Sequence, residues 1–105
     1  MTDHKHPILI RFWEKISVTP NDCWEWNASL NGDNGYGLFW TGERTQVAHR
    51  FLYETIIGSV PVGFELDHLC RNKRCVNPSH LDVVTRSENT KRGIRWKKEK
   101  TRNAI

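Results

Sequence analysis

The sequence predicts a single small α+β domain, from its length, its apolar patterns and its turn residues. Its 105 residues suffice for one domain, and hydrophobic residues make up only 37% of them, so we expect a small core. Short alternating apolar runs, typical of strands, lie between segments with helical apolar spacing. Clusters of Gly, Asn and Pro separate these segments, as expected for tight turns between short elements.

The first half of the chain is expected to form a short helix and then a small antiparallel meander. Apolar residues at helical spacing predict an amphipathic helix over 7–16. Alternation of apolar and polar residues predicts strands at 23–26, 36–40 and 44–48, with turn residues between them. These segments predict a meander of up to three strands.

The second half is expected to form a helix, a strand pair and a last helix. Apolar spacing predicts a helix over 49–57. Short strands are predicted at 64–68 and 81–85, on either side of an irregular polar loop at 69–80. Ser87 is expected to cap a further helix, so these elements give the order strand, loop, strand, helix.

Basic charge is concentrated toward the C-terminus. Residues 1–66 carry five Lys/Arg against eight Asp/Glu, a net charge of −3, whereas 67–105 carry eleven against four, a net charge of +7. This asymmetry predicts a surface that faces nucleic acid, and a solvated tail is the alternative. We assign the domain to 1–93 and a basic C-terminal tail, disordered apart from Trp96, to 94–105.

A cluster of metal-binding residue types lies in and near the polar loop. Four residues separate Cys70 from Cys75, and four more separate Cys75 from His80. Cys23, the third cysteine, completes a set of three thiolates and one imidazole, which suits a closed, structural zinc site. The alternative is three buried reduced cysteines and an unrelated histidine. A redox thiol protein fits poorly, because the chain has no Cys-x-x-Cys motif.

The sequence also predicts a soluble, cytoplasmic protein with no membrane partner. No apolar run is long enough to span a bilayer. The start of the chain does not look like a signal peptide, because Arg11 interrupts the short apolar run at 8–10.

The order of these motifs resembles the ββα-metal nucleases. Residues 68–81 resemble the His-Cys box of homing endonucleases, in which the same cysteine and histidine spacing holds a structural zinc. Asp67 and His68, followed by Asn77 and by 87–89, resemble the HNH endonucleases of phages and mobile introns.

Two upstream elements extend this resemblance. Residues 23–26 and 48–50 are similar to elements of small phage HNH proteins, so that the resemblance covers roughly 22–93. The resemblance implies a phage-encoded ββα-metal domain that is stabilised by a structural zinc and acts in the host cell.

The resemblance implies a role for each matching residue in DNA hydrolysis. His68 matches the general base, and Asp67 and Asn89 match the ligands of a catalytic Mg²⁺ or Mn²⁺. His80 takes the place of a histidine that in many HNH members binds the catalytic ion, so here that ion is left to Asp67 and Asn89. The implied products are a 5′-phosphate and a 3′-hydroxyl. The implied structural zinc ligands are Cys23, Cys70, Cys75 and His80.

Each of these residues also has a plainer interpretation. Asp67 is compatible with a turn at a strand end, His68 with a satisfied polar residue, and Asn89 with an ordinary helix start. Asn77 precedes Pro78 and is expected to be a helix N-cap. The resemblance leaves open a second, supporting role for Asn77, in which it steadies the base histidine. The alternative function is therefore a zinc-stabilised DNA-binding module without catalysis.

Double-stranded DNA is the expected partner whether the chain is a nuclease or a binding module. It would be bound through its phosphates, with a strong dependence on salt. For Arg50, a salt bridge at a helix start is as compatible with the sequence as a phosphate contact. The sequence leaves monomer and dimer both open. The basic residues expected at the DNA are Arg50, Arg71, Lys73, Arg74, Arg86, Lys91 and Arg92.

Overall fold

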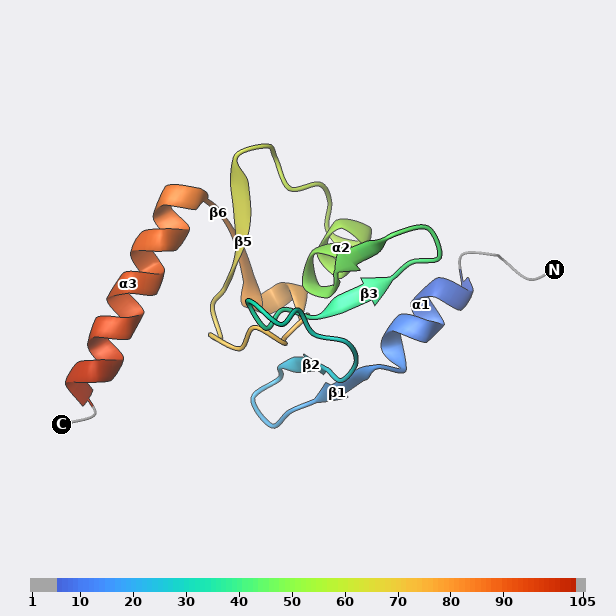
Figure 1. Ribbon diagram of the computed structural model, residues 1–105, viewed down its shortest axis with the longest axis horizontal. Helices are drawn as coiled ribbons and strands as arrows, with labels where there is room; N and C mark the ends of the chain where they lie inside the picture. The colour runs from blue at the N-terminus through green and yellow to red at the C-terminus, as the bar shows by residue number, and fades with distance from the viewer. Residues whose placement is uncertain (1–5, 104–105) are drawn as a thin grey trace.

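A computed structural model describes residues 6–103 of the chain, with side chains over 8–95. Within these residues, three two-stranded antiparallel sheets and three α-helices make up an α+β domain, which confirms the predicted class (Figure 1). The helices are α1 (His6–Trp13), α2 (Ala48–Ile56) and α3 (Arg86–Asn103), and a 3₁₀ turn, η1, covers Pro78–His80. The strands are β1 (Ile16–Val18), β2 (Trp24–Trp26), β3 (Leu38–Trp40), β4 (Thr45–Val47), β5 (Phe64–His68) and β6 (Leu81–Thr85).

The predicted three-stranded meander is wrong, because its strands belong to two separate hairpins. Strand β2 pairs with β1, whose first residue, Ile16, was predicted to be the end of the first helix, and β3 pairs with β4. An isolated bridge between Leu30 and Gly37 lies within the segment that connects the two hairpins. Helix α1 ends at Trp13, three residues earlier than predicted, which leaves Ile16 to start β1.

The second edge of β2 is occupied by the polar loop, which explains why β3 does not pair there. The backbone N–H of Trp26 donates to the carbonyl of Arg74 at 2.9 Å. The N–H of Val76 donates to the carbonyl of Trp24 at 2.8 Å. The loop between β5 and β6 is therefore fixed to the N-terminal hairpin by main-chain hydrogen bonds, over about fifty residues of sequence.

An aromatic core connects the first helix to the two hairpins and α2. Phe12 lies with its ring centroid 4.8 Å from that of Trp26 and 5.0 Å from that of Phe39. Leu52 from α2 and Val76 from the loop complete this fully buried cluster. The loop thus contributes one core side chain of its own, which adds apolar burial to its backbone contacts.

The predicted strands at 64–68 and 81–85 are confirmed to the residue, and they pair in antiparallel register. Helix α3 follows directly, and its first turn is capped by Thr85, whose Oγ1 accepts from the N–H of Glu88 at 3.1 Å. The predicted cap at Ser87 is therefore wrong by two residues.

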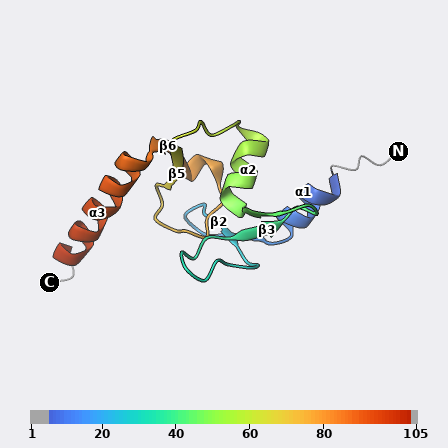
Figure 2. The ribbon, with the colours of Figure 1, turned by 45° about the horizontal axis from the view of Figure 1, so that its top comes forward.

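The backbone of α3 is helical as far as Asn103, so the expected disorder after Gly93 does not hold for the residues described. Figures 1 and 2 both show this helix extending away from the rest of the domain. The side chain of Trp96 lies outside the described residues, and the boundary between 1–93 and 94–105 stays a prediction. No helix in the described part of the chain has the length and hydrophobicity that a membrane crossing requires.

Gly37 is expected to be intolerant of a side chain, because a Cβ there meets Trp26 Cδ1 at 2.5 Å and Cγ at 2.7 Å. Gly37→Ala should therefore lower the free energy of unfolding by about 1–3 kcal/mol, the usual effect of overpacking a core. Gly32→Ala is the matched control, since a Cβ there has nothing within 4 Å. Urea unfolding of both variants measures the difference, and equal stabilities would contradict this account of Gly37.

Candidate functional site

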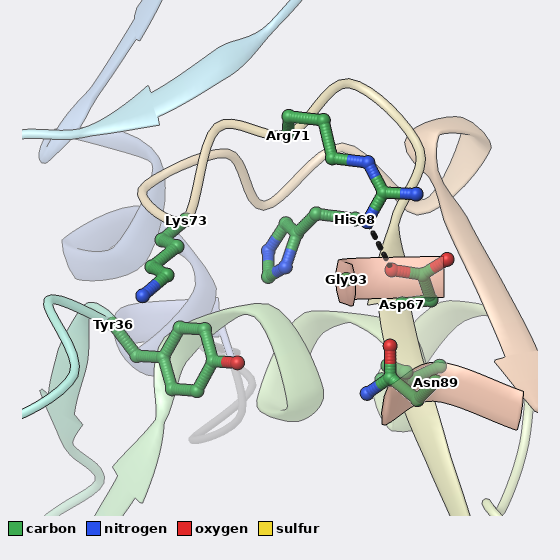
Figure 3. Close-up of a pocket in the computed structure, with 8 residues that line it drawn as sticks. Tyr36, Asp67, His68, Arg71, Lys73, Asn89 and Gly93 are labelled. Carbon is green, nitrogen blue, oxygen red and sulfur yellow. Dashed lines mark hydrogen bonds and ion pairs between the residues drawn. The ribbon is translucent and has the colours of Figure 1, made fainter. Parts of the chain in front are cut away.

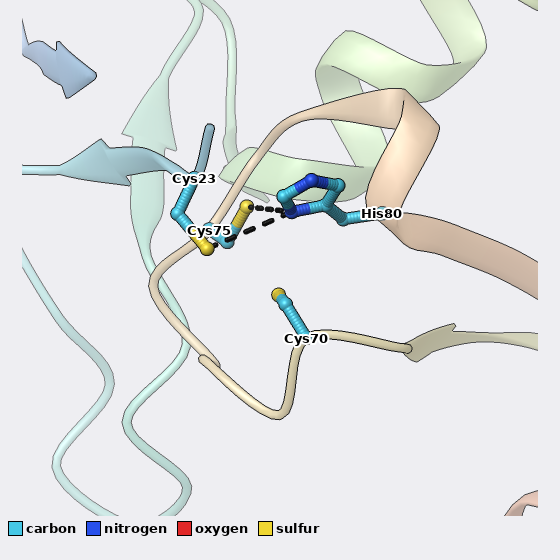
Figure 4. Close-up of side chains that lie close together, drawn as sticks. All are labelled: Cys23, Cys70, Cys75 and His80. Atoms are coloured by element: carbon cyan, nitrogen blue, oxygen red, sulfur yellow. Dashed lines mark hydrogen bonds between the residues drawn. The ribbon is translucent and has the colours of Figure 1, made fainter. Parts of the chain in front are cut away.

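The four predicted zinc ligands lie together at the junction of the N-terminal hairpin and the loop (Figure 4). Their ligand atoms all lie within 4.8 Å of one another. His80 Nδ1 is 3.6 Å from Cys23 Sγ and 3.5 Å from Cys75 Sγ. Cys23 and Cys75 are buried, and Cys70 is partly so.

This donor set fits a tetrahedral zinc ion. Bond lengths of about 2.3 Å to sulfur and about 2.0 Å to nitrogen place neighbouring donors about 3.5 Å apart, as the sulfur–nitrogen distances here are. Burial is the main cause that raises the pKa of the Cys75 thiol, to about 12. A thiolate at this position therefore needs a cation beside it, which a metal ion supplies.

A pocket of about 200 Å³ lies on the other side of the loop, and the three predicted catalytic side chains line it (Figure 3). Asp67 and His68 come from the end of β5, and Asn89 comes from the first turns of α3. The remaining wall is formed by Tyr36, Leu66, Arg71, Lys73 and Gly93.

The imidazole of His68 is held in one orientation by the loop. Its Nε2 lies 3.0 Å from the carbonyl oxygen of Cys75, and because a carbonyl only accepts, Nε2 carries the proton. In the neutral ring Nδ1 is then the acceptor. Burial is the largest cause that lowers the pKa of His68 below 6.5, while the bond to Cys75 opposes it. The ring is therefore neutral near pH 7 and able to accept a proton.

The carboxylate of Asp67 is held by two arginines from different elements. Its side chain is 4% exposed, and Arg71 Nη1 lies 3.1 Å from Oδ1. Arg92 Nη1 from α3 lies 3.1 Å from Oδ2 and also pairs with Asp82 at 2.9 Å. The interpretation of Asp67 as a simple turn former is incomplete, because this buried carboxylate links the loop to α3.

Asn89 lines the pocket from α3, and its side-chain amide is held by a hydrogen bond to β5. Its Nδ2 donates to Glu65 Oε1 at 2.8 Å, and Figure 3 shows its oxygen on the side of Asp67. Glu65, two residues before Asp67 on β5, also accepts from Arg86 Nε at 2.9 Å. Glu65 was not among the site residues predicted from the sequence, although strand alternation places it on the same face as Asp67.

Two ring side chains next to His68 were also missed. His49, at the start of α2, is 6% exposed and lies edge to face with His68 at a centroid distance of 4.4 Å. Tyr36 is stacked on His68 at 5.7 Å. Local sequence patterns carry no signal for these ring contacts, because His49 and Tyr36 lie 19 and 32 residues before His68 in the chain. His49 Nδ1 is buried without a hydrogen-bond partner.

Asn77 is an N-cap, as predicted from the following proline. Its Oδ1 accepts from the N–H of Ser79 at 2.9 Å, and its Nδ2 donates to the carbonyl of Asp22 at 2.8 Å. Asn77 thereby fixes the turn that leads to His80. The helix that it caps is the 3₁₀ turn η1.

The predicted DNA-binding residues have different surroundings. Arg50 pairs with Glu54 at 3.1 Å, one turn further along α2. Arg74 donates to the carbonyl of Trp26 at 2.9 Å and so anchors the loop. The ammonium group of Lys73 lies 6.0 Å from the ring centre of Tyr36 at the pocket. Lys91 is exposed on α3.

The fold and site define a metal-compatible domain with a histidine and two oxygen donors in one pocket, and comparison with known proteins relates part of it to a known family. Residues 46–91, from β4 into α3, match the model of the HNH endonuclease family. This segment contains the whole pocket except Tyr36 and Gly93. The match confirms the resemblance found in the sequence and supports a nuclease.

The curated relatives are phage proteins. The chain is 39% identical to Protein 7.7 of Escherichia phage T7 over 69 residues, which are 66% of this chain and 52% of that protein. It is 35% identical to Protein 2.8 of the same phage over 77 residues, 73% of this chain and 52% of that protein. The chain spans about half the length of these relatives. No solved structure matches it significantly.

Protein purified without added metal is expected to hold one zinc ion per chain, and Cys75→Ser is expected to lose it. Because a structural zinc contributes directly to folding, the melting temperature should fall by roughly 10 °C or more. Elemental analysis and a thermal melt measure both effects. Ser79→Ala, in the neighbouring turn, is the control and should keep zinc and stability. Full zinc content in Cys75→Ser would contradict the assignment.

Stability is expected to fall in mild acid because of His49. Burial is the largest cause that lowers the pKa of His49, to about 3, against about 6.5 in the unfolded chain. The unfolded state therefore binds the additional proton below pH 6.5, and folding loses about 1.5 kcal/mol between pH 6.5 and pH 5 from this group.

His49→Phe keeps a ring but removes this titration. Urea unfolding at pH 6.5 and pH 5 should show a smaller loss for this variant than for the wild type, since all other titrating groups are shared. An equal loss in both proteins would mean that His49 accepts a proton in the folded state.

Proposed function

We propose that this protein is a metal-dependent DNA endonuclease or nickase that hydrolyses phosphodiester bonds, with His68 as the general base. The observation that carries the proposal is the 3.0 Å contact from His68 Nε2 to the Cys75 carbonyl, in a ring that lines the pocket. That contact leaves Nδ1 as the free acceptor for the proton of an attacking water.

The surroundings of His68 keep it in the form that a base requires. Burial lowers its pKa, so the ring is neutral at the pH of a cell. His49 and Tyr36 pack against the ring and restrict its rotation. A fixed, neutral imidazole loses little entropy when it accepts a proton from bound water.

Asp67 and Asn89 are the proposed ligands of a catalytic Mg²⁺ or Mn²⁺. Both offer oxygen donors in the same pocket as His68, and such ions prefer oxygen and often use only one or two protein groups. The ion would supply positive charge for the phosphate and the departing 3′ oxygen. Arg71 and Arg92 pair with Asp67 and are also proposed to contact the phosphate oxygens.

The second ion of the proposal is a structural Zn²⁺ in the Cys23, Cys70, Cys75 and His80 cluster. In this proposal the β5–β6 hairpin, the loop and α3 form a ββα-metal unit around the catalytic ion, and the zinc stabilises the loop of that unit. Hydrolysis in this arrangement is expected to leave a 5′-phosphate and a 3′-hydroxyl.

Double-stranded DNA is the proposed substrate, and the cytoplasm of a phage-infected host is the proposed place of action. The phage relatives support the second statement. The first is supported by basic side chains at the rim of the pocket, among them Arg71 and Lys73, and by the net charge of +7 in residues 67–105. The proposed nuclease domain is 1–93, with 94–105 as its basic extension.

The alternative is a zinc-stabilised DNA-binding module without catalysis. One observation favours it: both oxygens of Asp67 already have arginine partners, as in a purely structural ion pair. The endonuclease is preferred because a binding module has no use for a neutral, oriented histidine beside a carboxylate and an amide oxygen.

A plasmid nicking assay separates the two. Supercoiled DNA should be cut by the wild type with Mg²⁺ or Mn²⁺ but not with EDTA at a level that leaves zinc bound. His68→Ala should lose at least about 100-fold in rate, the usual effect of removing a general base. This variant should remain folded and should keep its zinc and its DNA affinity in a gel-shift assay. Equal nicking by both proteins would refute the role of His68.

A further inference from the structure

Asn89 alone does not determine which of its two side-chain atoms faces the pocket. A carboxamide has an oxygen, which binds a hard cation, and an NH₂ group, which repels one. Rotation by half a turn about its last bond exchanges them at almost no steric change. A ligand asparagine therefore works only if a neighbour fixes its orientation.

Glu65 is such a neighbour. A carboxylate is acceptor-only, and Glu65 Oε1 lies 2.8 Å from Asn89 Nδ2. A salt bridge with Arg86 compensates the charge of this carboxylate. With the NH₂ group held on the side of Glu65, Oδ1 is directed toward Asp67 (Figure 3).

Glu65 is itself held in place. Its other oxygen accepts from Arg86 Nε at 2.9 Å, and its backbone lies within β5, paired with Val84 of β6. The carboxylate thus links the strand that carries Asp67 to the helix that carries Asn89. A rigid strand is a better support for a ligand orientation than a surface loop.

We propose that Glu65 is a positioning residue, which orients the Asn89 amide so that its oxygen faces the catalytic metal position beside Asp67. The inference rests on the proposed function, since it deepens the role of Asn89 in it. Glu65 does not touch the reacting atoms and acts only through Asn89.

Glu65→Gln is the informative variant, because it keeps the length of the side chain but replaces an obligate acceptor with a group that pairs equally with either face of Asn89. We expect the Mn²⁺ concentration for half-maximal nicking to rise about tenfold, the usual effect of losing one charge-assisted hydrogen bond. The rate at saturating Mn²⁺ should change little. An unchanged Mn²⁺ midpoint in an active protein would overturn the proposal.

Glu25→Gln is the matched control. Glu25 also accepts from an asparagine, Asn72, at 3.0 Å and lies 3.9 Å from an arginine, Arg74, but outside the pocket. This variant removes the same charge and the same kind of hydrogen bond, and its Mn²⁺ midpoint should match that of the wild type. An equal rise in both variants would mean that net charge, not orientation, sets the midpoint.

A second readout does not depend on cleavage. In ¹⁵N spectra of the zinc-loaded protein without Mn²⁺, the side-chain amide protons of Asn89, assigned from their absence in Asn89→Asp, should show a hydrogen-bonded shift and slow exchange. Glu65→Gln should remove both features and Glu25→Gln should keep them. Identical Asn89 signals in wild type and Glu65→Gln would overturn the proposal.

The double variant separates orientation from general effects of charge. In the Asn89→Asp background the two ligand oxygens are equivalent, so Glu65→Gln should bring no further rise in the Mn²⁺ midpoint. A further tenfold rise there would contradict the proposal. If the wild type shows no metal-dependent nicking, the proposed function fails, whereas the amide signals still decide whether Glu65 orients Asn89.

Discussion

The closure of the 70–80 loop onto the N-terminal hairpin is the constraint on which the rest of the structure depends. Cys75 shows this most directly. Its Sγ lies in the Cys/His cluster, its neighbours pair with β2, and its carbonyl oxygen accepts from His68 Nε2. A metal ion that stabilises the loop would therefore also determine which nitrogen of His68 carries the proton. The coupling is physical, because one residue belongs to both sites.

The pocket combines a neutral imidazole with a buried, doubly paired carboxylate. Burial keeps His68 and His49 uncharged, whereas Asp67 stays in the interior only because Arg71 and Arg92 compensate its charge. The excess of arginine and lysine around these groups makes the mouth of the pocket attractive to a phosphate. The same residues that hold the site together thus suit the substrate that we propose.

Local sequence patterns predicted the elements around the site well and the N-terminal sheets poorly. Strands β5 and β6 and the cap at Asn77 follow from alternation and from the Asn-Pro pair, which act within a few residues. Strand β1 was missed because three residues carry too little pattern to be separated from the end of a helix. The meander failed for a nonlocal reason, since the loop at 74–76 competes for the free edge of β2.

The sequence by itself determined the α+β class, the four-ligand cluster and the candidate catalytic residues His68, Asp67 and Asn89. These predictions depend on motif order and ligand spacing, which are properties of the linear sequence. The tertiary structure alone decided their partners: the Cys75 carbonyl for His68, two arginines for Asp67 and Glu65 for Asn89. Tautomer, ion pairing and amide orientation depend on distances of about 3 Å between segments far apart in the chain, and sequence spacing does not encode those distances.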